Sequence, residues 1–217
     1  MKKNSITYEV FQKYGAIFEN ISKNNLLKTE LAEYGYDDAE IAKGKALYDS
    51  AWQKIDTNKT ETTEEKFAYE AFSKKYEALK KAYQTDRKKA KIIFKDDNAS
   101  LSALNLKGVA STRISGVIND ADTLYKQLSV NENLRTPLKK LKIDETYIAQ
   151  QLTLLTETQQ AYHLYLKEKG ESEQATKNKN NALAELEKWV KEFYAIAKIA
   201  LEDQPLLLES LGKSVRN

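Results

Sequence analysis

The sequence predicts an all-α protein, and three observations support that class. Apolar residues recur at three- and four-residue spacing along the chain, and no stretch alternates as a half-buried strand does. Gly (7) and Pro (2) are scarce among the 217 residues, as is typical of long helices. The chain also repeats itself at a single long interval, which indicates two similar helical halves.

The repeat is clearest where Ala90–Leu104 (AKIIFKDDNASLSAL) returns as Ala197–Leu211 (AKIALEDQPLLLESL), 197 − 90 = 107 positions later. About 20 of ~106 aligned positions are identical, and many others exchange one apolar residue for another. We therefore expect a tandem duplication, with a 107-residue period, of a helical-hairpin or bundle unit with pseudo-twofold symmetry. The expected domains are helical repeat 1 (residues 1–107) and helical repeat 2 (residues 108–217), packed separately or as one domain.

Each half is expected to open with a long helix and a short one. The apolar spacing predicts the first helix over residues 5–21, with a counterpart in the second half. The short helix is expected to be capped by Thr29, or by Thr136, where Pro137 takes the first helical position. Gly35 is expected to end the first copy in a left-handed conformation.

The next helix is expected to start at Asp37 or Asp144, whose carboxylates can accept N-terminal N–H groups. An apolar pair flanks each start as a hydrophobic staple does: Tyr36 with Ile41, and Ile143 with Ile148. The same signal in both halves makes this the best-defined boundary in the chain.

The third helix of each half carries an apolar stripe in which Leu79 and Leu186 occupy the same core position. It is expected to end at Asp96 or Asp203, and that aspartate is expected to cap a last short helix. Of the 13 Tyr and two Trp, those on the stripe are interpreted as core residues, with an aromatic ligand groove as the alternative.

A polar tract separates the second and third helices of each half, over Thr57–Lys66 and Lys167–Asn181. One interpretation is a turn that folds the two helices into a hairpin, favoured by a capping box at Thr62–Glu65 and by Gly170 after two lysines. The other is one continuous helix from Asp37 to Lys95, favoured by a seven-residue register and a gapless alignment of the halves. The hairpin is the favoured interpretation.

Composition limits the chemistry. The chain has no Cys, and hence no disulfide, thiolate nucleophile or cysteine metal site. The N-terminus MKKNSITYEV lacks the apolar segment of a signal peptide, and no stretch is apolar enough to span a bilayer, so a cytoplasmic location is expected. The net charge of +3 is too small to imply a polyanionic partner.

No catalytic, cofactor-binding or metal-binding residue is predicted, and no cofactor. His163 is the only histidine, and the residue three before it is Gln160, so the Glu-x-x-His pattern of di-iron bundles is missing. The recurring carboxylates Asp96 and Asp203 are interpreted as helix caps rather than as a paired site.

A basic cluster in the third helix of the first half provides the one candidate binding set. Its members are candidate anion-binding residues: Lys80, Lys81, Arg87, Lys88 and Lys91. Acidic residues, among them Asp86, are interleaved with them, and the second half has several glutamates in the same region. A solvated helix face is therefore the favoured interpretation, with a surface for nucleic acid or acidic lipid as the alternative.

Two stretches carry a resemblance to a known group of proteins. They are the run Ile199–Gly212 (IALEDQPLLLESLG) and the run Leu31–Asp37 (LAEYGYD). Over most of its length the chain resembles a duplicated, uncharacterised bacterial helical family. The resemblance implies the all-α duplicated fold, and it implies no activity, cofactor or partner.

These observations favour a non-catalytic structural or interaction protein that presents helix faces to another copy of itself or to a protein partner. The reason is the lack of a recognisable active-site constellation. An anion-binding module that uses the basic helix of the first half is the first alternative, and an enzyme that uses Tyr and carboxylate groups is the second.

Overall fold

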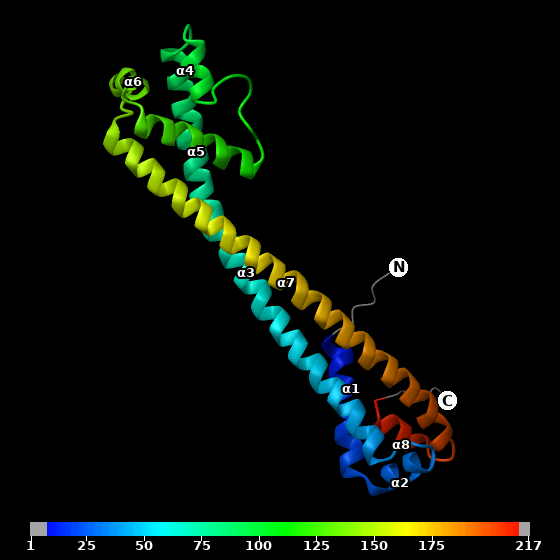
Figure 1. Ribbon diagram of the computed structural model, residues 1–217. Coiled ribbons are helices and arrows are strands. Elements are labelled where there is room, and N and C mark those ends of the chain that lie inside the picture. Colours follow the sequence, from blue (N-terminus) through cyan, green and yellow to red (C-terminus); the bar gives the residue numbers. More distant parts are fainter. Residues whose placement is uncertain (1–7, 213–217) are drawn as a thin grey trace. The chain divides into compact units, whose positions relative to one another are not determined.

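The computed structural model describes residues 8–212, and these residues form helices joined by short connections, without a strand. The predicted all-α class is confirmed. Within this range, no helix combines the length and the apolar character needed to cross a bilayer. In chain order (Figure 1) the elements are α1 (Tyr8–Lys23), α2 (Asn25–Glu33), α3 (Asp38–Ile93), α4 (Asn98–Ala103), α5 (Ile114–Val130), α6 (Glu132–Arg135), the 3₁₀-helix η1 (Thr136–Leu141), α7 (Glu145–Ala200) and α8 (Pro205–Ser210).

The two long helices start where the sequence predicts. The Asp37 carboxylate accepts a hydrogen bond from the backbone N–H of Glu40 at 2.9 Å. The Asp144 carboxylate accepts one from the N–H of Tyr147, also at 2.9 Å. Each aspartate therefore satisfies one of the N–H groups that a helix N-terminus leaves without an intrahelical partner.

The short helix α2 begins earlier than expected and ends as expected. Its cap is Asn24, whose Oδ1 accepts from the N–H groups of the second and third residues after it at 3.0 and 3.2 Å. The predicted cap, Thr29, instead lies inside the helix and donates its hydroxyl to the Asn25 carbonyl. Gly35 has φ +87°, the left-handed conformation predicted for it.

The other predicted caps are also displaced. Asn131, and not Thr136, caps the helical turn α6, while Thr136 opens η1. Asp97, and not Asp96, caps α4 by accepting from two backbone N–H groups at 3.0 Å. No side chain caps α8, so the predicted role of Asp203 is wrong as well. The caps that form are asparagines five positions before Thr29 and Thr136 and the aspartate directly after Asp96, and the sequence pattern does not rank such candidates.

The hairpin interpretation is wrong, because α3 and α7 are each continuous over 56 residues and contain the polar tracts. Within α3, Thr57 donates its hydroxyl to the carbonyl four residues before it, as threonine does inside a helix. The buried face of the tract is polar: the Asn58 amide donates to the Thr176 hydroxyl at 2.9 Å and accepts from Lys179. The tract therefore packs without apolar residues, which explains why its composition looks like that of an exposed turn.

A substitution at Gly170 tests whether α7 is continuous at this position. Gly170 lies inside α7, and a Cβ added there would meet no atom within 4 Å. We expect Gly170→Ala to raise the free energy of unfolding by about 0.5–1 kcal/mol in denaturant melts followed by far-UV circular dichroism. Gly35→Ala is the matched control and should lower it by about 1 kcal/mol, since its φ is left-handed. A loss of stability in Gly170→Ala would instead indicate a turn at this position.

The chain forms two compact units. Unit 1 combines the described residues up to Glu61 with those from Glu171 onward, and unit 2 is Thr62–Gly170. The predicted boundary between residues 107 and 108 is not where the units divide. Each unit instead takes segments from both halves of the chain.

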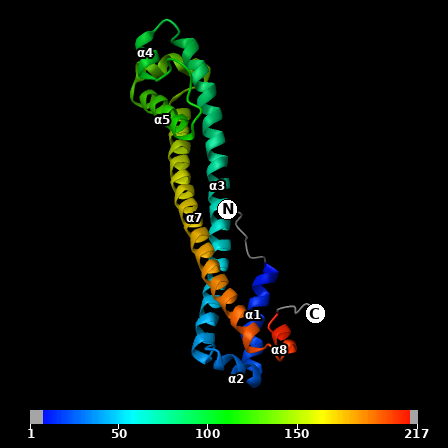
Figure 2. The same cartoon turned by 90° about the vertical axis from the view of Figure 1, so that its right-hand side faces the viewer.

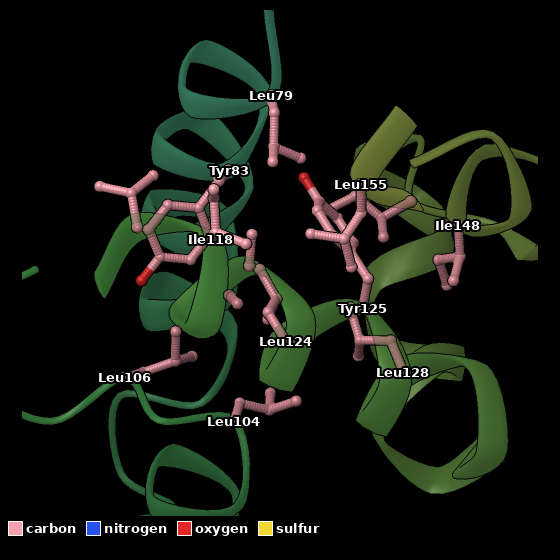
Figure 3. Close-up of a cluster of buried hydrophobic side chains, with 14 of the residues drawn as sticks. Leu79, Tyr83, Leu104, Leu106, Ile118, Leu124, Tyr125, Leu128, Ile148 and Leu155 are labelled. Carbon is pink, nitrogen blue, oxygen red and sulfur yellow. The ribbon is translucent and has the colours of Figure 1, made fainter. Parts of the chain in front are cut away.

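The core of unit 2 is formed by the later part of α3 with α5 and the first part of α7, and α4 and α5 lie beside α3 (Figures 1 and 2). Leu79 is fully buried there, as predicted. Figure 3 shows the central side chains: Leu79, Tyr83, Leu104, Leu106, Ile118, Leu124, Tyr125, Leu128, Ile148 and Leu155.

The core of unit 1 is formed by α1, α2 and the first part of α3 with the last part of α7 and α8. Leu186 is fully buried in it, as predicted. Much of this core is aromatic: the Trp189 ring stacks on Phe193 with centroids 5.3 Å apart, and it lies 5.5 Å from Phe18. Core packing is therefore confirmed for the aromatic residues of this stripe.

Candidate functional site

Arg87, one of the candidate anion-binding residues, is buried and used internally. Its guanidinium donates to the carbonyl oxygens of Asn105 at 3.0 Å, Leu106 at 3.1 Å and Gly108 at 2.9 Å. Lys91 donates to the same Gly108 carbonyl at 3.1 Å. These two residues hold the connection that follows α4, and their cationic groups are engaged with backbone oxygens.

The other three members of the basic cluster are at the surface. Lys80 forms an ion pair with Glu77 at 3.4 Å, and its Nζ lies 5.6 Å from the centroid of the Tyr76 ring. Lys81 and Lys88 are exposed and seven residues apart, on a different side of α3 from Lys80. The cluster therefore divides into a pair that holds a loop and three surface lysines.

A buried carboxylate that the sequence interpretation treated as an ordinary surface charge lies beside this cluster. Asp86 is 1% exposed, and it accepts hydrogen bonds from the hydroxyl groups of Tyr125 at 3.0 Å and Tyr147 at 2.7 Å. Lys89 lies 3.4 Å from the same carboxylate. We call Asp86, Tyr125 and Tyr147 the Asp86 cluster; its members come from α3, α5 and α7.

The electrostatics of the Asp86 cluster suit a structural role. Burial, together with the neighbouring Asp86 carboxylate, raises the pKa of both Tyr125 and Tyr147 well above the usual tyrosine value. Both phenols therefore stay protonated at neutral pH and donate to the carboxylate. Because Asp86 and Tyr125 are closed off from solvent, a substrate could not reach the carboxylate without opening the core.

The other residues that the sequence analysis considered as site residues, namely His163, Asp96 and Asp203, do not come together as a site within either unit. His163 is exposed on α7. Asp96 is exposed beside Lys95, 3.7 Å away, in unit 2, and Asp203 belongs to unit 1.

A groove of about 690 Å³ lies in unit 1, between α1 and the start of α3. We call it the α1–α3 groove. Its walls are one stripe from each helix, with residues at three- and four-residue spacing. The α1 wall comprises Gln12, Gly15, Ala16, Phe18, Glu19, Ile21 and Ser22, the α3 wall comprises Asp38, Ile41, Ala42, Lys45 and Tyr48, and Lys28 of α2 completes the lining.

Tyr48 shapes the α1–α3 groove. Its ring stacks on Phe11 with centroids 4.6 Å apart and lies 5.8 Å from Phe18. A Cβ added to Gly15 would lie 2.7 Å from the Tyr48 hydroxyl oxygen, so a glycine at this position allows the ring to lie close to α1. Burial raises the pKa of Tyr48, and the phenol is therefore a neutral contact surface at physiological pH.

Charged groups at the edge of the α1–α3 groove are already paired. Lys28 lies 2.9 Å from Asp38, and Glu19 lies 2.6 Å from Lys23. Lys45 pairs with Asp49 at 2.5 Å and also lies over the Tyr48 ring. The groove therefore offers a contact surface with small and aromatic side chains between neutralised charges.

Comparison with family models, with curated proteins and with solved structures finds no match for this chain. The sequence resemblance to a duplicated bacterial helical family therefore stays a prediction.

Proposed function

We propose that this protein is a non-catalytic interaction protein that holds a helix of a protein partner in the α1–α3 groove. The groove itself is the observation that carries the proposal. Its walls are exposed stripes of two helices that already pack on a common core, so that a third helix could complete a local bundle.

The dimensions of the groove fit a helix of about three turns. The wall of α1 extends from Gln12 to Ser22 and that of α3 from Asp38 to Tyr48. The ends of each wall are ten residues apart, which is about 15 Å along a helix. Small residues in the middle of the walls, Ala16 and Ala42, allow the axis of a third helix to approach closely. An occupant with apolar residues at i, i+3 or i+4, and i+7 matches this spacing.

The charged groups at the edge of the groove are already paired, and this favours a partner with an apolar contact face. Since Lys28, Lys45 and Glu19 each have an ion-pair partner within unit 1, a strongly charged ligand would have to displace those partners. The alternative of an anion-binding module has less support, because Arg87 is engaged with three backbone carbonyls. An amphipathic helix is therefore the occupant that we propose.

A photoreactive amino acid at the exposed position Ala42 tests the proposal, in cells that make the protein naturally. We expect it to cross-link to one face of an amphipathic helix in a partner protein, and Ala16→Arg on the opposite wall should abolish the cross-link. Ile92, exposed in unit 2, is the control position. Cross-links to a second copy of the chain would identify a homo-oligomer. The same cross-links from Ile92, or insensitivity to Ala16→Arg, would contradict the proposal.

We also propose that the chain arose by tandem duplication with the period of the sequence repeat, and we call positions separated by that period equivalent. The bounds of the long helices support this, since Asp38 and Glu145 (145 − 38 = 107), like Ile93 and Ala200 (200 − 93 = 107), are equivalent. Four of the five left-handed residues in the described part of the chain form equivalent pairs: Gly35 (φ +87°) with Lys142 (φ +63°), and Asn105 (φ +51°) with Gly212 (φ +83°). The fifth is Gly108, whose equivalent position lies outside the described residues. A left-handed lysine is uncommon, so that this agreement is more than shared composition.

A further inference from the structure

We propose that two sets of core contacts, the Asp86 cluster in unit 2 and the contact of Trp189 with Gly44 in unit 1, determine which segments of the chain pair with each other. Each unit is cross-paired, meaning that it combines segments of both halves. In the self-paired alternative, each half would close on itself as a hairpin. The inference rests on the proposed duplication in one respect only. The duplication tells us that, in the self-paired form, each contact residue would be replaced by the residue at its equivalent position.

The first set of contacts is electrostatic. The positions equivalent to Tyr125 and Tyr147 hold Phe18 and Glu40. In a self-paired first half, the buried Asp86 carboxylate would face a ring without a donor and a second carboxylate. Lys89, on the same helix, would be its one remaining partner, and a buried carboxylate with too few hydrogen bonds is strongly unfavourable. In the cross-paired form Asp86 accepts two hydroxyl hydrogen bonds in addition.

In a self-paired second half, the hydroxyl donors would be present and the carboxylate acceptor would be missing. The position equivalent to Asp86 holds Phe193, which lies in the aromatic core of unit 1 and meets the Tyr36 ring edge-on at 5.2 Å. In a self-paired second half, Phe193 would replace Asp86 beside Tyr125 and Tyr147. Both hydroxyl groups would then lose their acceptor, and for the buried Tyr125 hydroxyl this is unfavourable because no solvent replaces it.

The second set of contacts is steric. A Cβ added to Gly44 would lie 2.3–2.5 Å from three carbon atoms of the Trp189 ring, so that this ring fits only against a glycine. The position equivalent to Gly44 holds Gln151. In a self-paired second half, Trp189 would meet Gln151, whose side chain begins where the ring must lie. The electrostatic and the steric contacts therefore both disfavour the self-paired form.

A cysteine pair can report on the pairing, because the chain has no cysteine of its own. Lys75 and Glu157 form an ion pair at 2.6 Å between α3 and α7 within unit 2, and they come from different halves. The variant K75C/E157C, treated with a short bismaleimide, should give an intramolecular cross-link that peptide mass spectrometry identifies. The exchange D86F/F193D should lower the cross-link yield at least about tenfold, since it removes the matched contacts of both units.

The rescue variant carries all six exchanges, D86F/F193D, Y125F/F18Y and Y147E/E40Y, and has the composition of the parent. It should restore the cross-link, because the carboxylate moved into the core of unit 1 then regains two hydroxyl donors. Parental yield in D86F/F193D would overturn the inference, and so would failure of the sixfold exchange to restore it. Binding at the α1–α3 groove is measured separately by the Ala42 cross-link in the otherwise unchanged protein, because F18Y alters a residue that lines the groove.

The steric contact has its own test in unit 1, where N58C/T176C reports on a contact between α3 and α7. Gly44→Gln should lower the cross-link yield at least about tenfold. Adding Trp189→Ala removes the ring that the new side chain would meet, and the double variant should therefore regain the cross-link yield, although each substitution alone is unfavourable. This non-additive recovery is the result that we expect. A double variant no better than Gly44→Gln alone would overturn the steric part.

Discussion

Leu79→Ala and Leu186→Ala are each expected to lower the free energy of unfolding by about 2–5 kcal/mol, in denaturant melts followed by far-UV circular dichroism. Both side chains are 0% exposed, one in the core of unit 2 and one in the core of unit 1. Truncation removes buried methyl groups and leaves a cavity that the surrounding helices can fill only in part. The two losses should be similar, because the two leucines occupy equivalent positions in matching stripes.

The chain offers matched controls for this pair. Ile92 and Ile199 also occupy equivalent positions, and they are 68% and 55% exposed. Ile92→Ala and Ile199→Ala should change the free energy of unfolding by less than about 0.5 kcal/mol. A loss as small as this in Leu79→Ala or Leu186→Ala would show that the residue does not belong to the core.

Tryptophan fluorescence can assign the effects to the units, because Trp52 and Trp189 are both in unit 1. Leu186→Ala is expected to shift the fluorescence transition to lower denaturant concentration. For Leu79→Ala, the fluorescence and circular-dichroism transitions coincide only if the two units unfold together. Their separation in this variant would measure how independently the units unfold.

Local signals in the sequence predict local features well. The apolar periodicity and the scarcity of Gly and Pro predict the all-α class. The paired signals at Asp37 and Asp144 predict the starts of the two long helices. These features depend on residues within one or two helical turns of each other, so that the chain displays them directly.

The sequence interpretation failed where the deciding partner is distant in the chain. The tract around Asn58 looked like an exposed turn because it lacks apolar residues, and its actual partners, Thr176 and Lys179, lie 118 and 121 positions further along the chain. A capping box at Thr62–Glu65 is also compatible with a helix interior, because its residue types are tolerated there. Local pattern alone could not choose between the hairpin and the continuous helix.

The Asp86 cluster was missed, although one signal for it exists in the sequence. Asp86 falls on the same helical stripe as Leu79, Tyr83 and Ala90, at seven, three and four residues from them, where an apolar residue is expected. A charged residue at a core position indicates a buried polar contact. Its partners Tyr125 and Tyr147 could not be named, because their approach to Asp86 depends on cross-pairing of the halves. The α1–α3 groove was missed for a similar reason, since it depends on how two helices pack.

The double variant Tyr125→Phe/Tyr147→Phe is expected to lower the free energy of unfolding by about 3–5 kcal/mol, because it removes two hydrogen bonds to a charged group, each worth about 1.5–3 kcal/mol, and leaves the buried Asp86 carboxylate with Lys89 alone. It removes both hydroxyl groups that donate to Asp86 and preserves the aromatic rings. Denaturant melts at neutral pH measure the loss. Tyr76→Phe, in the same core, is the control and should cost less than about 0.5 kcal/mol.

Adding Asp86→Leu to the double variant separates a loss of hydrogen bonds from a loss of packing. When a buried polar group and its partners are all replaced by apolar residues of similar size, the change is often close to neutral. The triple variant should therefore recover most of the lost stability. A triple variant no more stable than the double variant would indicate that the tyrosine hydroxyl groups act by filling space. In that case the Asp86 cluster would not determine which segments pair, and the inference drawn from it would fail.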